Sequence, residues 1–401
     1  MSALDGTRVI DLTRVIAGPL AGQILADLGA DVIKIERPIA GDDVRHLGPP
    51  WMKDINGNEL KESTYYSAVN RGKRSITLDF SKAEGLKLLK RLIADADILL
   101  ENFRPGVLAK YGLDYDAISR DNKKIIYCSV SGFGHSGPYM ERPGYDFLIQ
   151  GMAGVMSVTG KPGAGPTRAG IPIADYSAGL TAVIGVLSAL NHRNVSGKGQ
   201  MVDVALFDCQ VSMMLNVFSA WFNAKKSIAQ SNDHPSACPH GVFPTKDGNI
   251  IIATMNDAQF TRIAKILGKP EWANDVRFAK NGGRVEHQTE LIGKMSQIMR
   301  EQPSEYWLNV LAHANIPSGP INKIEDLEKD SQLLAREMIV EFNDSEKGSI
   351  KTAGNPIKLS DTPIQYTLPP PRLGAHTESV LAEILNLSAA EIAALRVKSV
   401  I

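Results

Sequence analysis

Cysteine, aromatic residues and net charge are all scarce in this chain of 401 residues. The three cysteines, Cys128, Cys209 and Cys238, are odd in number and lack paired spacing, so we expect reduced thiols rather than a disulfide framework. The 44 basic and 44 acidic residues cancel, which leaves no strong field to attract nucleic acid or an anionic membrane surface. The zero net charge does not exclude a local cluster of basic residues that binds an anionic ligand.

Targeting and metal-binding signals are missing as well. The N-terminus has no basic segment followed by an apolar one, and the apolar runs are expected to be too short and too interrupted to span a bilayer. The eight histidines include no short-spaced pair with the partners that metal sites use. We therefore expect a cytoplasmic protein that binds no metal, no nucleic acid and no membrane.

Strand and helix patterns alternate through the first half of the chain. Short apolar runs bounded by Gly or Pro alternate with helical periodicity, which is typical of β-α-β units around a parallel sheet. The pattern predicts an α/β fold with a large Rossmann-like domain. The expected strands are 7–12, 31–36, 97–101, 124–130 and 200–206, and the expected helices are 20–28, 82–94, 145–155, 177–192 and one that follows 206 to about 224.

The sequence of the second half predicts a smaller α/β unit, followed by a tail that returns to the large domain. The polar segment 225–239 is interpreted as a linker, and the tail carries a proline-rich run, 368–372, that cannot be helical. We predict that residues 1–224 form the first part of the large domain, 225–320 the linker and small domain, and 321–401 the return to the large domain. Expected elements are a strand at 248–253, helices from about 258 and 288 and at 304–314, strands at 338–342 and 349–352, and a closing helix from about 379.

The stretch 171–179 sets one carboxylate, Asp175, in a small apolar turn at the start of a long apolar helix. Low polarity raises the pKa of a carboxyl group and makes its anion a better nucleophile toward an activated carbonyl. An Asp just before a helix is also a preferred N-cap. On these residues alone, the N-cap is the favoured interpretation.

Three glycines, Gly132, Gly134 and Gly137, match the G-x-G-x-x-G spacing after a predicted strand. Pro138 follows at once, and no helix opens there to bind a pyrophosphate. We expect a turn that lets the backbone approach a ligand or another chain, rather than a dinucleotide site.

Basic residues gather near the predicted strand ends of the first third. They fit a phosphate-rich ligand at the carboxyl edge of the sheet or ordinary solvated charge about equally well. The residues are Lys34, Arg37, Arg71, Lys73, Arg74, Arg104 and Lys110.

Several of these blocks, taken in order, resemble the family III (CaiB/BaiF-like) CoA-transferases over nearly the whole chain. Within that family, the sequence most resembles the members that transfer CoA from succinyl-CoA to dicarboxylates such as glutarate. The blocks are 9–19, 25–38, 70–79, 101–106, 144–146, 174–179, 196–200 and 354–359.

The resemblance implies that Asp175 is the nucleophile. It would attack an acyl-CoA to form a mixed anhydride, then carry CoA as an aspartyl thioester to an acceptor carboxylate. CoA and acyl-CoA are substrates, and no cofactor is implied. A small-residue turn of Ala174, Ala178 and Gly179 would keep water out and offer N–H groups to the oxyanion.

Further site residues follow from the resemblance by position. Arg37 and Lys110 would pair with CoA phosphates and Phe103 would pack on adenine, which turns the interpretation of the basic residues toward phosphate binding. Tyr145 and Asp146 would lie beside the acyl group. The full set that lines the CoA site is Ile16, Ala17, Arg37, Leu78, Asn102, Phe103, Arg104, Lys110, Tyr145 and Asp146.

The resemblance also implies an interlocked homodimer, and it leaves rival functions. A 2-methylacyl-CoA racemase shares the fold but has a histidine where this chain has Tyr145, and a phenol with a pKa near ~10 is a poor base. An oxalate or formate type of transferase is another alternative. The glycine-rich loop of the formyl-transferring members is not found here, and 235–243 is more similar to the succinyl-CoA users. A noncatalytic acyl-CoA or dinucleotide binder would have no use for Asp175.

Overall fold

The computed structural model describes residues 1–401, which divide into two compact units. Unit 1 comprises Met1–Ala153, Ala169–Leu215 and Ser331–Ile401, and unit 2 comprises Gly154–Arg168 and Asn216–Asp330. The boundaries differ from those expected at 224 and 320, and residues 154–168, assigned from the sequence to the large domain, belong to unit 2. The helix expected to reach 224 is broken at Met213 and Met214, so its second half is a separate helix.

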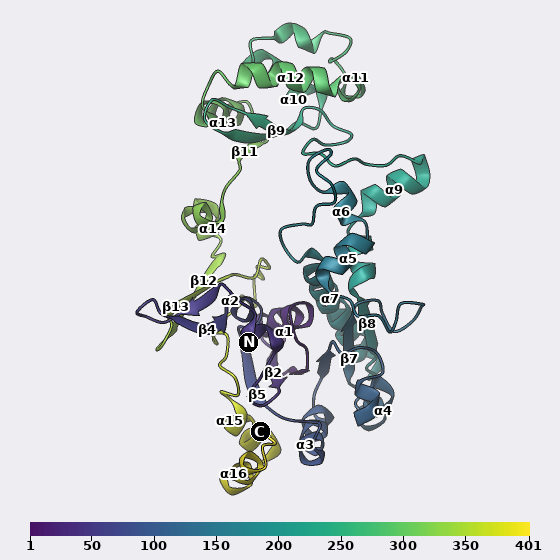
Figure 1. Ribbon diagram of the computed structural model, residues 1–401, viewed down its shortest axis with the longest axis vertical. Coiled ribbons are helices and arrows are strands. Elements are labelled where there is room, and N and C mark those ends of the chain that lie inside the picture. Colours follow the sequence, from purple (N-terminus) through teal and green to yellow (C-terminus); the bar gives the residue numbers. More distant parts are fainter. The chain divides into compact units, whose positions relative to one another are not determined.

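Six parallel strands form the central sheet of unit 1, in the order β5-β2-β1-β6-β7-β8 (Figure 1). This confirms the α/β class and the large parallel sheet. The strands are β1 Arg8–Asp11, β2 Asp31–Glu36, β5 Lys73–Thr77, β6 Ile98–Glu101, β7 Ile126–Ser131 and β8 Met201–Ala205. The helices of unit 1 are α1 Ala17–Asp27, α2 Thr64–Ala68, α3 Ala83–Ala94, α4 Tyr115–Asp121, α5 Asp146–Met152, α7 Ile173–Ser196, α8 Leu206–Ser212, α14 Ser331–Ala335, α15 Thr377–Leu385 and α16 Ala389–Val397, with short 3-10 turns at Asp43–His46 and Leu108–Tyr111.

Hydrophobic cores cover both faces of this sheet, as a parallel sheet requires. Successive residues of a strand point to opposite faces. Val9 therefore packs in the core that contains α1 and α7, whereas Ile10 packs in the core that contains α3 and α15, and both are fully buried. The sheet thus forms the middle layer that carries the loops at its carboxyl edge.

Helix α7 is longer than predicted and corrects one expectation about membranes. At 24 residues it is long and apolar enough to cross a bilayer by length and composition, although half of its most apolar window is buried inside the protein. Its residues Ala174, Ala178 and Ala182 are fully buried against the core that includes α1. Small side chains on this face let α1 and α7 pack closely.

The remaining elements of unit 1 are two antiparallel hairpins. The two strands of the tail hairpin, β12 Ile339–Asp344 and β13 Gly348–Ala353, were predicted, although their pairing was not. The irregular hairpin of β3 Trp51–Lys53 and β4 Glu59–Ser63 was not predicted. Residues 368–372 form neither helix nor strand, as the prolines predict.

Unit 2 is a small α/β unit with a core around Phe243, Phe260 and Trp307. Its sheet is antiparallel, and β9 and β11 were not predicted. Its strands are β9 His240–Pro244, β10 Asn249–Ala253 and β11 Ser318–Pro320, and its helices are α6 Val155–Val158, α9 Leu215–Ala224, α10 Asp257–Ile266, α11 Asn281–Glu286, α12 Gln288–Met299 and α13 Ser304–His313, with 3-10 turns at Pro270–Ala273 and Ile324–Lys329.

Candidate active site

A cavity of about 400 Å³ in unit 1 opens at the carboxyl edge of the central sheet, where ligands of parallel sheets bind. The loop after β1, the segment after β6, the loop after β7 and the first turn of α7 all contribute to its wall. The lining residues include Arg14, Val15, Ile16, Ala17, Asp43, Asn102, Phe103, Arg104, Arg142, Tyr145 and Asp175.

Asp175 lies in the first turn of α7, because the helix begins at Ile173. The N-cap interpretation is therefore wrong: the N-cap position is Pro172, and no side chain caps this helix. The Asp175 side chain accepts no hydrogen bond, and the residue is only 9% exposed. Burial, with the nearby negative charge of Asp146, raises the pKa of Asp175 from 3.8 to about 7. The helix dipole would favour the anion, but loss of solvation outweighs it.

Asp146 and Gln150 on α5 fix the start of α7. Asp146 accepts hydrogen bonds from the Ala174 backbone N–H at 2.8 Å and from the Gln150 side chain at 2.6 Å. Gln150 is fully buried and accepts a hydrogen bond from the Ala169 N–H at 2.8 Å. The pair holds the backbone immediately before Asp175, so both act as positioning residues.

We expect Gln150→Leu to lower both stability and turnover. The substitution removes the buried hydrogen bond that Gln150 accepts from the Ala169 N–H, which costs about 1 to 3 kcal/mol, and it removes the Gln150 contact that holds Asp146. Urea unfolding and kcat measure the two effects. Gln210→Leu is the matched control, because Gln210 is equally buried but its Oε1 has no partner to lose. Equal behaviour of the two variants would contradict the positioning role.

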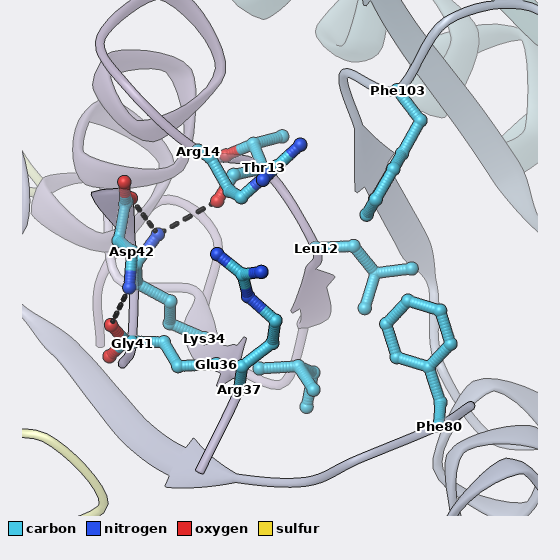
Figure 2. Close-up of a pocket in the computed structure, with 11 residues that line it drawn as sticks. Leu12, Thr13, Arg14, Lys34, Glu36, Arg37, Gly41, Asp42, Phe80 and Phe103 are labelled. Atoms are coloured by element: carbon cyan, nitrogen blue, oxygen red, sulfur yellow. Dashed lines mark hydrogen bonds and ion pairs between the residues drawn. The ribbon is translucent and has the colours of Figure 1, made fainter. Parts of the chain in front are cut away.

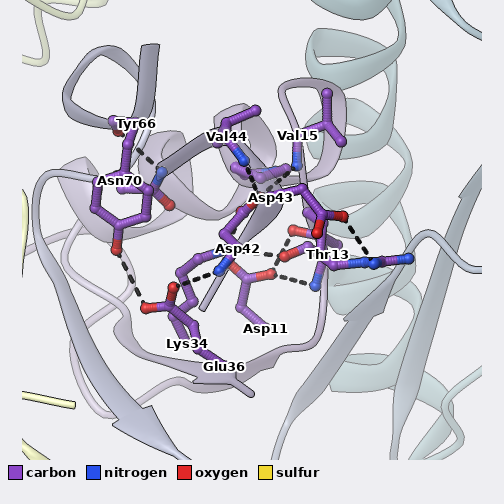
Figure 3. A network of polar contacts seen from close by, with 12 residues as sticks. Asp11, Thr13, Val15, Lys34, Glu36, Asp42, Asp43, Val44, Tyr66 and Asn70 are labelled. Carbon is purple, nitrogen blue, oxygen red and sulfur yellow. Dashed lines mark hydrogen bonds and ion pairs between the residues drawn. The ribbon is translucent and has the colours of Figure 1, made fainter. Parts of the chain in front are cut away.

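The loop that faces Asp175 is held by a buried polar network centred on Asp42 (Figure 3). One oxygen of Asp42 accepts hydrogen bonds from the backbone N–H groups of Val15 and Val44, each at 3.1 Å. The other accepts from Lys34 Nζ at 3.0 Å, and Lys34 also donates to the Thr13 carbonyl at 2.8 Å. Both charged side chains are fully buried.

This network stabilises an uncommon backbone conformation. Val15 has a φ of 71°, in the left-handed region that β-branched residues avoid. Asn102 adds two hydrogen bonds to the same loop, accepting from the Arg14 N–H at 2.9 Å and donating to the Arg14 carbonyl at 2.7 Å. Such strain persists only where surrounding contacts over-determine it, as they do at this cavity wall.

A smaller cavity of about 130 Å³ adjoins the first and shares Arg14 and Phe103 with it. In Figure 2, Arg37 and the rings of Phe80 and Phe103 lie on opposite sides of Leu12. Arg37 pairs with Asp43 at 2.8 Å, and Arg14 pairs with the same carboxylate at 2.9 Å. Aromatic rings and an exposed guanidinium on the wall of one cavity suit a ligand with both an aromatic base and a phosphate.

The sequence of residues 4–377 matches the profile of CoA-transferase family III. This chain belongs to that family. It is 44% identical over 382 residues to the succinate-glutarate CoA-transferase of Agrobacterium fabrum, covering 95% of each chain. It is 37% identical over 387 residues to the succinyl-CoA:glutarate CoA-transferase of Mus musculus, covering 96% of this chain and 87% of that one. Among solved structures, a CAIB/BAIF family protein from Brucella suis has a TM-score of 0.84 at 42% identity, covering 96% and 99% of the two chains.

The resemblance found in the sequence is thereby confirmed, and the chain is a CoA-transferase. Seven residues predicted for its site line the large cavity: Ile16, Ala17, Asn102, Phe103, Arg104, Tyr145 and Asp175. Arg37 lines only the adjoining smaller cavity.

Three predicted residues of the transferase lie outside both cavities. Leu78 is fully buried in the core between the sheet and α3, so its side chain packs there rather than facing a ligand. Lys110 is exposed on the turn Leu108–Tyr111. Asp146 holds the Ala174 backbone instead of facing the cavity.

Most of the basic cluster has a structural role, which corrects its assignment to phosphate binding. Lys34, Lys73, Arg71 and Arg74 form ion pairs with Asp42, Asp11, Asp27 and Asp31 at 3.0, 2.9, 2.7 and 2.6 Å. Lys34, Lys73 and Arg71 are buried, so their ion pairs stabilise the edge of the sheet from within the protein. Arg37, Arg104 and Lys110 remain exposed for a ligand.

The oxyanion donors expected around Asp175 are also corrected. The Ala174 N–H is bonded to Asp146, and Ala178 and Gly179 lie within α7, where backbone N–H groups bond along the helix. The N–H groups of Ile16 and Ala17, at the start of α1, have no backbone or side-chain acceptor.

The glycine turn after β7 approaches another segment of its own chain and also lines the large cavity. A Cβ at Gly132 would lie 2.7 Å from Gly144 Cα, so two backbones touch there. Sequence reasoning missed Arg14, Arg142 and Gln150 at this site. Arg14 could have been found, because it lies two residues before Ile16, which was predicted to line the site. No sequence pattern near Gln150 indicated its role.

Proposed function

We propose that this transferase moves CoA from succinyl-CoA to a dicarboxylate such as glutarate, with Asp175 as the covalent nucleophile. The observation that carries the proposal is a buried carboxylate without hydrogen bonds on the wall of a cavity large enough for an acyl-CoA end. The substrates named for the Agrobacterium fabrum and Mus musculus relatives support the choice of donor and acceptor.

In the first step, an Asp175 oxygen attacks the thioester carbonyl of the donor. The C–S bond breaks, CoA leaves as its thiolate, and a mixed aspartyl anhydride forms. The thiolate then attacks the aspartyl carbonyl, which releases the donor acid and leaves an Asp175–CoA thioester. The acceptor carboxylate enters and the two steps run in reverse, so each difficult transfer is divided into easier ones.

The surroundings of Asp175 suit each step. Burial weakens solvation of the anion, and the free N–H groups of Ile16 and Ala17 would stabilise the tetrahedral oxyanion. The rigid Asp42 network keeps these donors in place. The adenosine end of CoA would extend toward the smaller cavity, with Phe103 against adenine and Arg37 on a phosphate.

Hydroxylamine trapping tests the proposal. Succinyl-CoA added without acceptor should give a hydroxamate on the peptide that contains Asp175, detected by mass spectrometry, and Asp175→Asn should give none. A racemase or a noncatalytic binder forms no activated aspartyl group. An unmodified peptide after long exposure to succinyl-CoA and other acyl-CoA donors would therefore contradict the transferase mechanism.

An interlocked homodimer is part of the proposal. Unit 1 exposes apolar side chains on α5 and α7, among them Phe147, Leu148, Leu180 and Ile184, which are 61%, 43%, 51% and 66% exposed. Exposed apolar surface of this kind is typical of an interface between subunits. The cytoplasmic location and the absence of a resident cofactor stay predictions.

A further inference from the structure

A dicarboxylate substrate brings a second anion into the cavity beside Asp175. This point rests on the proposed function, in which succinyl and glutaryl groups carry a free carboxylate at the end remote from the reacting carbon. Moving an unpaired carboxylate out of water is costly, and the charge of Asp175 would repel it. A site that prefers dicarboxylates therefore needs a cation that is not already neutralised.

Three arginines line the cavity, and two of them are assigned by their neighbours to the CoA end. Arg14 pairs with Asp43, packs 5.2 Å from the Phe103 ring centre and also lines the smaller cavity. Arg104 follows Phe103 in the chain and faces a separate cavity that contains Glu101 and His135 as well. Arg142 remains.

The guanidinium of Arg142 is positioned by aromatic rings rather than by an acid. It lies 4.6 Å from the ring centre of Tyr139 and 5.8 Å from that of Phe133. Phe133 is itself buried and packs against Phe207. Stacking fixes the plane of an arginine and leaves its N–H donors available for a bidentate carboxylate.

Arg142 is also tied to the frame that holds Asp175. Two residues further along the chain, Gly144 makes close backbone contact with Gly132 at the end of the sheet. Asp146 then bonds the backbone of Ala174. The loop that carries Arg142 and the turn that carries Asp175 are therefore braced against each other.

We infer that Arg142 binds the remote carboxylate of the dicarboxylate substrate and so determines the specificity of this transferase for diacids. The carboxylate takes the place of solvent on the open edge of the guanidinium. The acyl carbon of the same substrate then lies at Asp175.

Trapping with two matched donors tests this inference. Succinyl-CoA and butyryl-CoA have acyl chains of the same length, but only the first carries a remote carboxylate. The second-order rate constant for hydroxamate formation at Asp175 is measured without acceptor for the wild type, Arg142→Gln and Arg142→Lys. We expect Arg142→Gln to lower the rate constant for succinyl-CoA about 10- to 100-fold, as loss of a charge-assisted contact predicts, and to change that for butyryl-CoA less than about threefold. Arg142→Lys should restore part of the loss.

Arg104→Gln is the matched control, because an arginine at the CoA end should affect both donors equally. Equal losses for both donors in Arg142→Gln would instead assign Arg142 to CoA itself, and unchanged rates for both would remove it from substrate binding; either result overturns the inference. If the wild type is not labelled by either donor, the proposed function fails and this inference fails with it. If the wild type is labelled, the proposed function stands and the rate constants of the variants test the role of Arg142 alone.

Discussion

Asp175→Asn is expected to lower kcat for CoA transfer by about 10⁴-fold or more, because an amide oxygen cannot form an acyl anhydride. The substitution keeps the shape of the side chain, and Asp175 has no hydrogen bond for the variant to lose. It should therefore fold as the wild type does. Transfer from succinyl-CoA to glutarate, with a circular dichroism spectrum of each protein, measures both points. Activity of the variant at the wild-type level would exclude Asp175 as the nucleophile.

The same variant should be more stable than the wild type, in a manner that depends on pH. The pKa of Asp175 is raised from 3.8 to about 7 in the folded chain, so its proton is lost at lower pH from the unfolded chain. The wild type is thus destabilised progressively as pH rises from about 4 to 7, by as much as about 4 kcal/mol at higher pH, since each pKa unit corresponds to about 1.4 kcal/mol. Asn does not titrate. Urea unfolding at pH 5 and pH 8 should show a larger advantage for the variant at pH 8, and the same advantage at both would contradict the raised pKa.

The central fold could be predicted because its signals are local. Strand β2 has the bounds expected from its apolar run, and β1 alternates between two cores as its period of two requires. The hairpin of β3 and β4 was missed because its pairing is irregular and its residues are largely polar.

The candidate site was found by resemblance, but its internal arrangement depends on contacts between distant residues. Asp175 lies within the first turn of α7, and the Ala174 N–H before it donates to Asp146, which is 28 residues away in the chain. The burial of Lys73 depends on Asp11, 62 residues distant in the chain. Residue spacing and composition do not indicate which distant residues form ion pairs. The basic residues buried at the edge of the sheet were therefore mistaken for ligand contacts.

The close approach of α1 and α7 gives the second large effect that we expect. Gly179 lies one turn after Asp175 on the same face of α7, and a Cβ there would lie only 2.8 Å from the Ala17 carbonyl oxygen. Gly179→Ala must push the first turn of α1 away from α7, which moves the N–H groups of Ile16 and Ala17 relative to Asp175. Overpacking of this kind costs about 1 to 3 kcal/mol, and a displacement near 1 Å at the reacting atoms lowers kcat about 100-fold.

Gly293→Ala separates this effect from a general response to alanine. Gly293 lies within α12, and a Cβ there would meet nothing within 4 Å. Alanine is the better helix former by about 1 kcal/mol, so the control should be slightly stabilised with unchanged turnover. Urea unfolding and kcat are measured for both variants. If Gly179→Ala retains wild-type kcat, the start of α1 does not supply the oxyanion donors, because the one substitution that must move it would have left the chemistry intact.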